Sequence, residues 1–349
     1  MAAGDVDTVH RWQVRRATAA RYRLATGALV LPLALGAADP ALSQQAPQPG
    51  VWSLTIDDDI VAGTDRYYTG GFALAWVASP QDMPDWARHL ARSLLPVDEG
   101  EARLGIAFGQ SAFTPSDITL ADPPSDDRPY AGWLYATFGL DVQSPRASDQ
   151  LSLTLGVVGP ASLAEQTQKA IHKVTGSPTP EGWGTQLHDE PGIVLTYQHL
   201  WRGFAAGTLG ALEIDLTPYA GGALGNVYTY ANAGLMVRYG RRLSSDLGPV
   251  RIQPGPAGSA FFVPAAGFSW YVFAAADGRA VARNIFLDGN TFQDSRSVDK
   301  EALVGDLQGG VELTWQDVRL SYTYVWRTRE FKTQAQPARF GSLGVSMAF

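Results

Sequence analysis

The sequence predicts an all-β protein, a twelve-stranded antiparallel transmembrane β-barrel with a short helix in an outer loop. The composition is the first observation: the 349 residues include 37 Gly, 10 Trp, 13 Tyr and 14 Phe, but only 17% are charged. Many aromatic residues and few charges are typical of membrane barrels. The second is a recurring alternation of apolar with small or polar side chains. The third is a final alternating segment that ends at Phe349.

The N-terminal segment has the features of an export signal. Five arginines between residues 11 and 23 precede an apolar stretch, Leu24–Ala38, which Pro32 interrupts. This stretch is too short to span a bilayer as a helix, which takes about 20 residues. Small residues at Ala41 and Ser43 suit a signal peptidase. We therefore expect residues 1–43 to be a removed signal peptide and 44–349 to be the barrel; the alternative is an N-terminal membrane anchor.

The rest of the chain is predicted to form strands. Leu151, Leu153 and Leu155 alternate with small polar residues, and successive strand side chains point to opposite faces of a sheet. No later segment approaches the roughly 18 apolar residues of a transmembrane helix. The predicted strands are 51–57, 68–79, 102–111, 130–142, 150–159, 192–201, 209–222, 226–240, 262–276, 302–316, 318–328 and 340–349.

A soluble sandwich would show the same alternation, and the end of the chain favours the barrel. Leu343, Val345, Met347 and Phe349 alternate with small residues, and apolar residues on such strands face lipid. An even number of strands leaves both termini on the periplasmic side. The outward connections are then 58–67, 112–129, 160–191, 223–225, 277–301 and 329–339.

Two connections on the periplasmic side are unusually long for a barrel. They are residues 80–101 and 241–261, whereas periplasmic turns are ordinarily short. Within the first of them, Pro84–Leu95 is compatible with a short amphipathic helix.

Charge and cysteine content exclude several classes of function. The formal net charge is −7, with 27 basic and 34 acidic residues, which argues against nucleic-acid binding because that requires a basic surface. The chain has no cysteine, which excludes disulfide scaffolds, thiolate zinc sites and cysteine nucleophiles.

Three polar segments fall at the predicted outer end of the barrel. The first contains Asp57, Asp58 and Asp59, whose carboxylates suit a hard cation; a solvated acidic turn is the alternative, because calcium sites need more ligands than these. The second is Asp126–Gly132, which either pairs a charge with the first segment or is a loop that enters a strand.

The third segment is predicted to be a helix. Ser162 and Glu165 have the spacing of a capping box, and Gly176 is a suitable stop after Val174. Glu165, Gln168 and His172 fall near one face of this helix. His172 stands out among the histidines by its position in an outer loop, although a lone histidine on a loop helix is more often a surface residue.

Four blocks of sequence, taken in order, resemble the outer-membrane lipid A 3-O-deacylase (LpxR-type) family. The resemblance extends from about Leu54 to Phe349. The blocks are Asp57–Trp76, Asp126–Tyr135, Gly159–Pro191 and Arg283–Phe292.

The resemblance implies a specific activity in the bacterial outer membrane. Members of this family hydrolyse the 3′-linked acyloxyacyl ester of lipid A, the anchor of lipopolysaccharide, in the outer leaflet. A histidine activates water, and Ca²⁺ stabilises the oxyanion. The family's catalytic histidine corresponds to His172, its Asn-Asp pair to Asp58 and Asp59, and the threonine of its Y-T-x-G motif to Thr69.

The chain departs from the family pattern at three positions. Asp58 replaces an asparagine, Ser125 lies nearest to the position of a functional lysine, and Pro178 replaces a glutamate six residues after the histidine. Two other functions are therefore considered. One is an outer-membrane phospholipase of the Ser-His type that uses His199, and the other is an inactive structural or pore-forming barrel.

Overall fold

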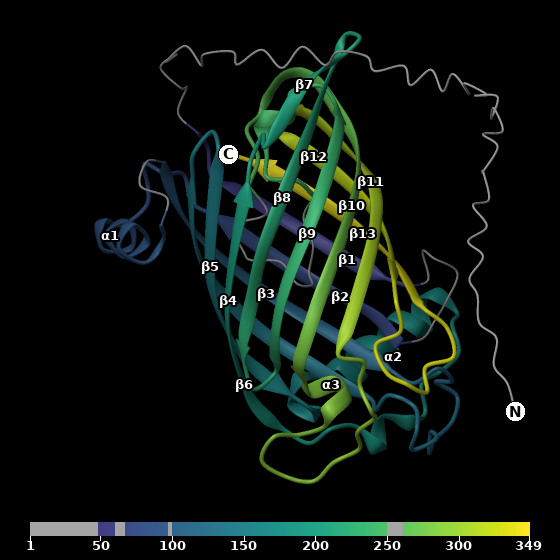
Figure 1. The fold of residues 1–349 in the computed structure, drawn as a ribbon. Helices are drawn as coiled ribbons and strands as arrows, with labels where there is room; N and C mark the ends of the chain where they lie inside the picture. Colours follow the sequence, from purple (N-terminus) through teal and green to yellow (C-terminus); the bar gives the residue numbers. More distant parts are fainter. Residues whose placement is uncertain (1–47, 60–66, 97–99, 250–260) are drawn as a thin grey trace, which may run out of the picture. The chain divides into compact units, whose positions relative to one another are not determined.

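The computed structural model describes residues 48–349 except for 60–66, 97–99 and 250–260 (Figure 1). The predicted signal peptide, residues 1–43, lies outside the described residues. In the described part, antiparallel pairing joins thirteen strands into one sheet. The strands are β1 (Val51–Asp58), β2 (Tyr67–Val77), β3 (Glu101–Thr114), β4 (Ala131–Gln143), β5 (Ala147–Val158), β6 (Glu190–Trp201), β7 (Ala205–Leu209), β8 (Leu212–Gly225), β9 (Tyr228–Gly240), β10 (Ala265–Asn284), β11 (Leu303–Gln316), β12 (Val318–Arg327) and β13 (Ala338–Ala348).

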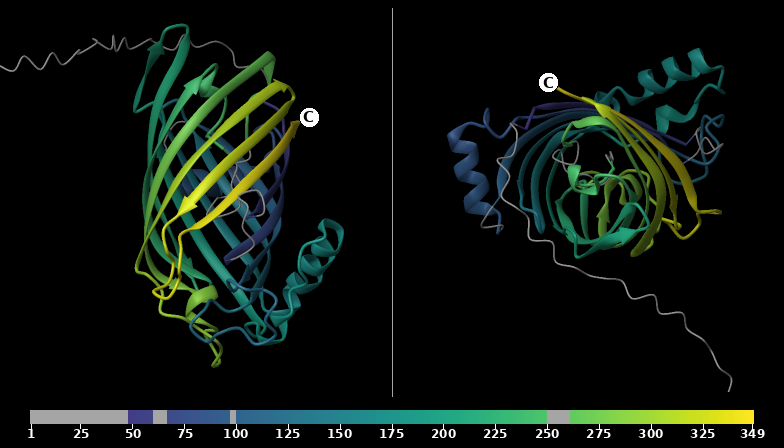
Figure 2. Two further views of the ribbon diagram at one scale, coloured as in Figure 1. Left: turned by 90° about the vertical axis from the view of Figure 1, so that its right-hand side faces the viewer. Right: turned by 90° about the horizontal axis from the view of Figure 1, so that it is seen from above.

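Twelve of these strands close into a barrel, which Figure 2 shows end-on as a ring. Strand β1 pairs with both β2 and β13, and β6 pairs with β8 to complete the ring. The short strand β7 pairs with the first residues of β8. The predicted twelve-stranded barrel is therefore confirmed, and each predicted strand has a counterpart in the ring.

Helical segments occupy several connections. They are α1 (Asp85–Leu94), η2 (Pro160–Ser162), α2 (Ala164–Thr175), η3 (Gly182–Thr185), η4 (Leu243–Ser245) and α3 (Ile285–Asp288). The connections that contain α2 and α3 lie at one end of the barrel, called here the α2 end. The opposite end, with α1 and the C-terminal Phe349, is the α1 end. Among the described helices, none is long and apolar enough to cross a membrane.

The two faces of the barrel wall follow the alternation of the sequence. Trp52, Leu54 and Ile56 of β1 are exposed on the outside, whereas Ser53 and Thr55 are buried in the lumen. Apolar residues outside and polar residues inside are what a barrel in lipid requires.

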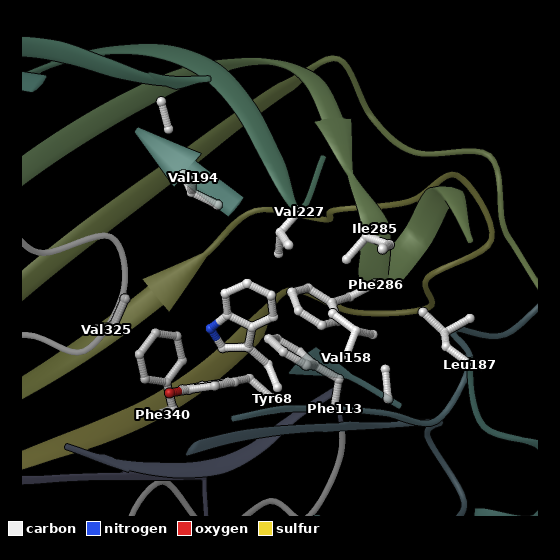
Figure 3. Close-up of a cluster of buried hydrophobic side chains, with 13 residues drawn as sticks. Tyr68, Phe113, Val158, Leu187, Val194, Val227, Ile285, Phe286, Val325 and Phe340 are labelled. Atoms are coloured by element: carbon white, nitrogen blue, oxygen red, sulfur yellow. The ribbon is translucent and has the colours of Figure 1, made fainter. Parts of the chain in front are cut away.

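The lumen is filled at the α2 end by an aromatic cluster (Figure 3). The rings of Phe113 and Phe286 stack with centroids 4.1 Å apart, and Tyr68 packs between Phe113 and Phe340. Phe286 comes from α3, so the β10–β11 connection folds over the lumen and contributes to its closure.

At the α1 end, Phe261 and Phe262 of the connection between β9 and β10 also enter the lumen. Phe261 and Phe262 pack against the lumen-facing side chains of Val51 and Val77. Arg319 of β12 donates a hydrogen bond to the carbonyl oxygen of Phe261 over 3.3 Å. The unusual length of this connection therefore has a structural reason, since its described parts fold inward rather than forming a turn.

The other long connection contains the predicted amphipathic helix, which is confirmed as α1. The helix begins after Pro84 and ends at Leu94, and it lies outside the barrel ring (Figure 2). Ala87 and Ala91 are fully buried in a cluster with Ala102 of β3 and Val142 of β4.

Candidate functional site

A row of small side chains crosses the outer wall at the α2 end. Asp58 of β1 pairs with Gly70 of β2, Gly70 pairs with Ala112 of β3, and Ala112 pairs with Gly132 of β4. A Cβ atom on Gly132 would lie 2.0 Å from the Oγ of Ser162. The absence of a side chain at Gly132 lets the segment that starts α2 lie directly against the wall.

The first turn of α2 differs from the predicted capping box. The cap residue is Leu163, in the left-handed region with φ of 59°, and no side chain caps the helix. Ser162 lies in the preceding helix η2, and its hydroxyl donates to the carbonyl of Gly159 over 2.6 Å. The predicted stop is confirmed: Gly176 is the C-cap with φ of 73°, and its N–H bonds the carbonyl of His172.

One face of α2 is buried against the wall, and a hydrogen bond fixes its start. Gln168 and His172 are buried, as their predicted common face suggests. The third residue of that face, Glu165, instead forms an ion pair with Lys169 over 2.7 Å. Gln110 of β3 donates from its Nε2 to the carbonyl of Ser162 over 2.6 Å. The buried face of α2 therefore consists of Ala164, Gln168 and His172.

A cavity of about 370 Å³ lies between α2 and the outer wall. Its wall side includes Leu54, Ile56 and Phe72, which belong to the exposed apolar surface of the barrel. The cavity therefore adjoins the surface that faces lipid, and it is separate from the lumen. Its lining is Leu54, Ile56, Asp57 and Asp58 of β1, Gly70, Gly71 and Phe72 of β2, Gln110 and Ala112 of β3, and Ala164, Thr167, Gln168, Ile171 and His172 of α2.

His172 is held in one orientation at this cavity. Its side chain is 3% exposed, and its Nδ1 lies 2.6 Å from the carbonyl oxygen of Pro178. A carbonyl oxygen only accepts hydrogen bonds, so Nδ1 carries the proton and donates it. In the neutral ring, Nε2 then has a free electron pair that can accept a proton.

Gln168 is the second polar residue that α2 contributes to the cavity. Its Oε1 accepts a hydrogen bond from the indole Nε1 of Trp183 over 2.7 Å. This bond fixes which end of the amide is which, because an indole N–H only donates. The amide nitrogen of Gln168 is buried and has no hydrogen-bond partner among the described residues.

The predicted cation ligands differ in their relation to the cavity. Asp58 lines it together with Asp57, while Asp59 is buried just beyond the end of β1 and is not part of the lining. The backbone of Thr69 belongs to β2, and its side chain lies outside the description. Within the described ranges, no group of three or more His, Cys, Asp or Glu residues is arranged to hold a metal ion.

Sequence reasoning missed two residues of the cavity. Asp57 was part of the acidic run but was not singled out, and its Oδ2 accepts a hydrogen bond from Tyr68 over 3.2 Å. Gln110 belongs to the apolar-alternating strand β3 and gave no signal beyond a polar residue on an outward-facing position.

Comparison with known proteins places this geometry in a family. A model of the family described as "Outer membrane protein LpxR" matches residues 29–349. The chain belongs to the LpxR family. This confirms the resemblance seen in the sequence and the location in the outer membrane, and it supports a lipid A deacylase as the general function.

One solved structure supports the fold. LpxR from Salmonella typhimurium has 18% sequence identity and a TM-score of 0.70, and the match covers 86% of this chain and 100% of that one. The β domain of the Bordetella autotransporter BrkA matches with 12% identity and a TM-score of 0.43, over 87% of this chain and 100% of that one. The second likeness is too weak to carry an argument. A search of curated proteins gave no match.

Position 178 is one where this chain departs from the family pattern. The glutamate expected there is replaced by Pro178, yet the backbone carbonyl of this residue accepts the hydrogen bond from His172. A backbone group needs no particular side chain, so the orientation of the histidine ring does not depend on the glutamate.

Over the residues that the structure describes, the segment Asp126–Gly132 does not form the charge pair with the first acidic segment that was considered from the sequence. Arg128 forms an ion pair with Glu330 over 3.4 Å, and Asp127 accepts hydrogen bonds from the backbone N–H and hydroxyl of Ser116. Among the described residues, Arg128 therefore links the β3–β4 and β12–β13 connections and does not pair with the aspartates of β1.

Two other histidines, His188 of the same connection and His199, the residue considered for a phospholipase, have structural contacts. The backbone N–H of His188 donates to Oδ1 of Asn290 over 2.9 Å. His199 lies on the outer wall of β6, with its Nδ1 2.6 Å from Oδ1 of Asp149. In the described part of the chain, no hydrogen bond joins His199 to a serine, as a Ser-His hydrolase requires.

Proposed function

We propose that this protein hydrolyses the 3′-acyloxyacyl ester of lipid A in the outer leaflet of the outer membrane, in a calcium-dependent reaction. The observation that carries the proposal is the cavity beneath α2, which brings His172 and Asp58 together on the lipid-facing side of the wall. Membership of the LpxR family supports the same reaction.

The position of the cavity suits an amphipathic substrate. Ile56 and Phe72 are exposed to lipid and also line the cavity, so an acyl chain can reach it without leaving an apolar environment. Ile171 and Val174 of α2 are exposed as well. The ester group lies between the acyl chains and the polar sugar of the substrate. In the cavity it would meet the polar side chains of Asp58, Gln168 and His172.

His172 is proposed to act as the general base. Its Nδ1–H donates to Pro178, and its Nε2 takes a proton from water, which attacks the ester carbonyl. The proton is later given to the leaving alkoxide, so that an alcohol and a free carboxylic acid are released. A positioned general base contributes about 10²- to 10⁴-fold to such a reaction.

The residues present fit a calcium site in their chemistry. Asp58 supplies carboxylate oxygens, which Ca²⁺ prefers, to the outer side of the wall. We keep Asp59, its neighbour in the sequence, and Thr69 as predicted ligands. When bound, Ca²⁺ would stabilise the negative charge that develops on the ester oxygen. The aspartate in place of asparagine at position 58 adds a charge that strengthens cation binding.

Gln168 is proposed to support the same charge or to orient the substrate. Its amide N–H groups face no partner in the described residues, while its oxygen is fixed by Trp183. A preorganised donor of this kind is worth about 10²- to 10³-fold when it bonds a developing oxyanion.

The deciding experiment is mass spectrometry of lipid A from cells with and without the protein. Loss of the mass of the 3′-linked acyloxyacyl group supports the proposal. Lysophospholipid formation without that loss would instead indicate a phospholipase, and an unchanged lipid profile would indicate a structural or pore-forming barrel.

A further inference from the structure

We propose that α1 is an interfacial helix whose Trp86, Leu90 and Leu94 insert into the phospholipid leaflet around the α1 end of the barrel. The inference concerns a surface at the opposite end from the candidate site, and it does not depend on the proposed hydrolase activity.

The side chains of α1 form three sectors. Ala87 and Ala91 are buried on one face. Beside this face, at intervals of four residues, Trp86, Leu90 and Leu94 are 66%, 42% and 53% exposed. Residues four apart lie on the same side of a helix, so these three form a continuous apolar stripe. The polar residues occupy the remaining sector.

The buried sector docks on the part of the barrel that faces lipid. Ala87 and Ala91 pack on Ala102 and Val142, and Ala102 shares its face of β3 with Phe108, which is 60% exposed. The helix therefore lies on the outward surface of the wall. Its exposed apolar stripe continues the surface that lipid already covers.

Exposed aromatic residues mark the same end of the barrel. They lie at the α1-end termini of their strands, where a girdle of aromatic rings identifies the boundary between lipid and water. Trp86 belongs to this set by its position outside the wall. The strand residues are Trp52 at the start of β1, Trp201 at the end of β6, Phe268 near the start of β10 and Trp315 near the end of β11.

The polar sector is suited to phospholipid head groups. Arg92 and His89 are exposed on it, whereas Arg88 is fixed by donating to the carbonyls of Pro80 and Met83. An amphipathic helix that combines Trp and Leu on one side with basic residues on the other lies in the plane of a membrane interface. A phospholipid leaflet therefore fits both sectors, and a water-exposed helix would leave the stripe uncovered.

The absence of cysteine in the chain allows a direct test. Trp86→Cys, Leu90→Cys and Leu94→Cys would each be spin-labelled in the full-length barrel, which is then reconstituted in phosphatidylethanolamine–phosphatidylglycerol vesicles. The measurement is the accessibility of the label to oxygen, which partitions into lipid, relative to a water-soluble nickel complex. Phe108→Cys on the wall is the lipid reference, and Asp85→Cys on the polar sector of α1 is the aqueous reference.

The expected result is an oxygen-to-nickel ratio at the three stripe positions that approaches that of Phe108→Cys and exceeds that of Asp85→Cys. A ratio equal to that of Asp85→Cys at all three positions would overturn the proposal. So would labels immobilised and shielded from both reagents, because that result would mean that a protein covers the stripe. Heat-modifiable migration in gels confirms that each variant is folded, and the three positions are independent, so one that misfolds leaves the others to decide.

Discussion

At the scale of single residues, the hydrogen bond between His172 and Pro178 sets the orientation of the proposed general base. The carbonyl of Pro178 accepts from Nδ1 over 2.6 Å, which fixes the ring and leaves Nε2 to accept a proton. In many hydrolases a carboxylate has this orienting role. A neutral carbonyl orients the ring equally well, but it stabilises the imidazolium less than a charged carboxylate does.

The first prediction concerns the histidine itself. His172→Ala and His172→Gln should fold normally and lose lipid A deacylation by about 10²- to 10⁴-fold, the range for a positioned general base. Activity is measured by release of the acyl group from purified lipid A.

His188→Ala is the matched control for this prediction, because it is a histidine of the same connection whose backbone, rather than its ring, bonds Asn290. It should retain activity. A His172→Ala variant with near-normal activity, alongside an inactive His188→Ala, would refute the assignment of the base.

The second prediction concerns the cation. Asp58→Ala should lower activity on the order of 10²-fold, since it removes a carboxylate from the cavity where the oxyanion would form. Excess EDTA should abolish activity, and added Ca²⁺ should restore it. Asp299→Asn, which alters an exposed aspartate paired with Lys332 at the same end, should change neither. Full activity in EDTA would rule out the calcium-dependent mechanism.

At the scale of elements, the site exists because a helix can approach a strand closely. Gly132 has no side chain, and the hydroxyl of Ser162 and the Cβ of Ala164 occupy the space that a Cβ would need. The helix α2 is thereby held at the height of the wall where Asp58 faces outward.

The third prediction follows from this contact. Gly132→Ala would place a Cβ 2.0 Å from Ser162 Oγ and 2.5 Å from Ala164 Cβ, so the start of α2 must move. Displacements of about 1 Å at a catalytic group cost up to roughly 10²-fold in rate, and we expect a loss of 10- to 100-fold with the barrel still folded. Gly278→Ala is the control, because the nearest atom to its Cβ is 4.0 Å away. Equal activity in the two variants would show that the close approach is not needed.

The strands of the ring are predicted well from the sequence, whereas the connections between them and the start of α2 are predicted less well. Alternation identifies all twelve strands of the ring, because each has one face in lipid. It misses β7, Ala205–Leu209, which pairs only with β8 and has no such constraint. The spacing of Ser162 and Glu165 suggests a capping box, but Ser162 bonds Gly159 instead. The spacing of residues cannot show that Ser162 belongs to the preceding 3₁₀ helix, where its hydroxyl bonds a carbonyl instead of capping α2.

The same limit applies to the candidate site. The residue types and the helix predict that Gln168 and His172 share one helix face, but they do not predict that this face is buried. The participation of Asp57 and Gln110 depends on strand register and on the packing of α2, which are long-range properties. The role of Pro178 depends on a backbone atom and leaves no trace in residue type.

At the scale of the whole molecule, described residues fill the lumen at both ends. Phe113 and Phe286 belong to the cluster at the α2 end, and Phe261 and Phe262 to the one at the α1 end. The barrel therefore carries the candidate site on its outer surface, and side chains pack in its interior at both ends.

The fourth prediction tests this view. The purified protein in a planar lipid bilayer should show no steady conductance of the kind that water-filled barrels produce, because aromatic side chains occupy the lumen. A porin reconstituted under the same conditions is the control. Stable single-channel openings would contradict the conclusion that the lumen is filled, and they would favour the alternative function as a pore.

A cavity on the lipid-facing wall also changes the kinetics of encounter. Substrate that enters it comes by lateral diffusion within one leaflet, so its relevant concentration is a mole fraction in the surface rather than a molarity in solution. Diluting the substrate with inert lipid at constant bulk concentration then slows the reaction, and adding bulk water does not. If the proposed hydrolase acts at this cavity, which Ile56 and Phe72 line, its turnover would depend on the lipid composition of the membrane around it.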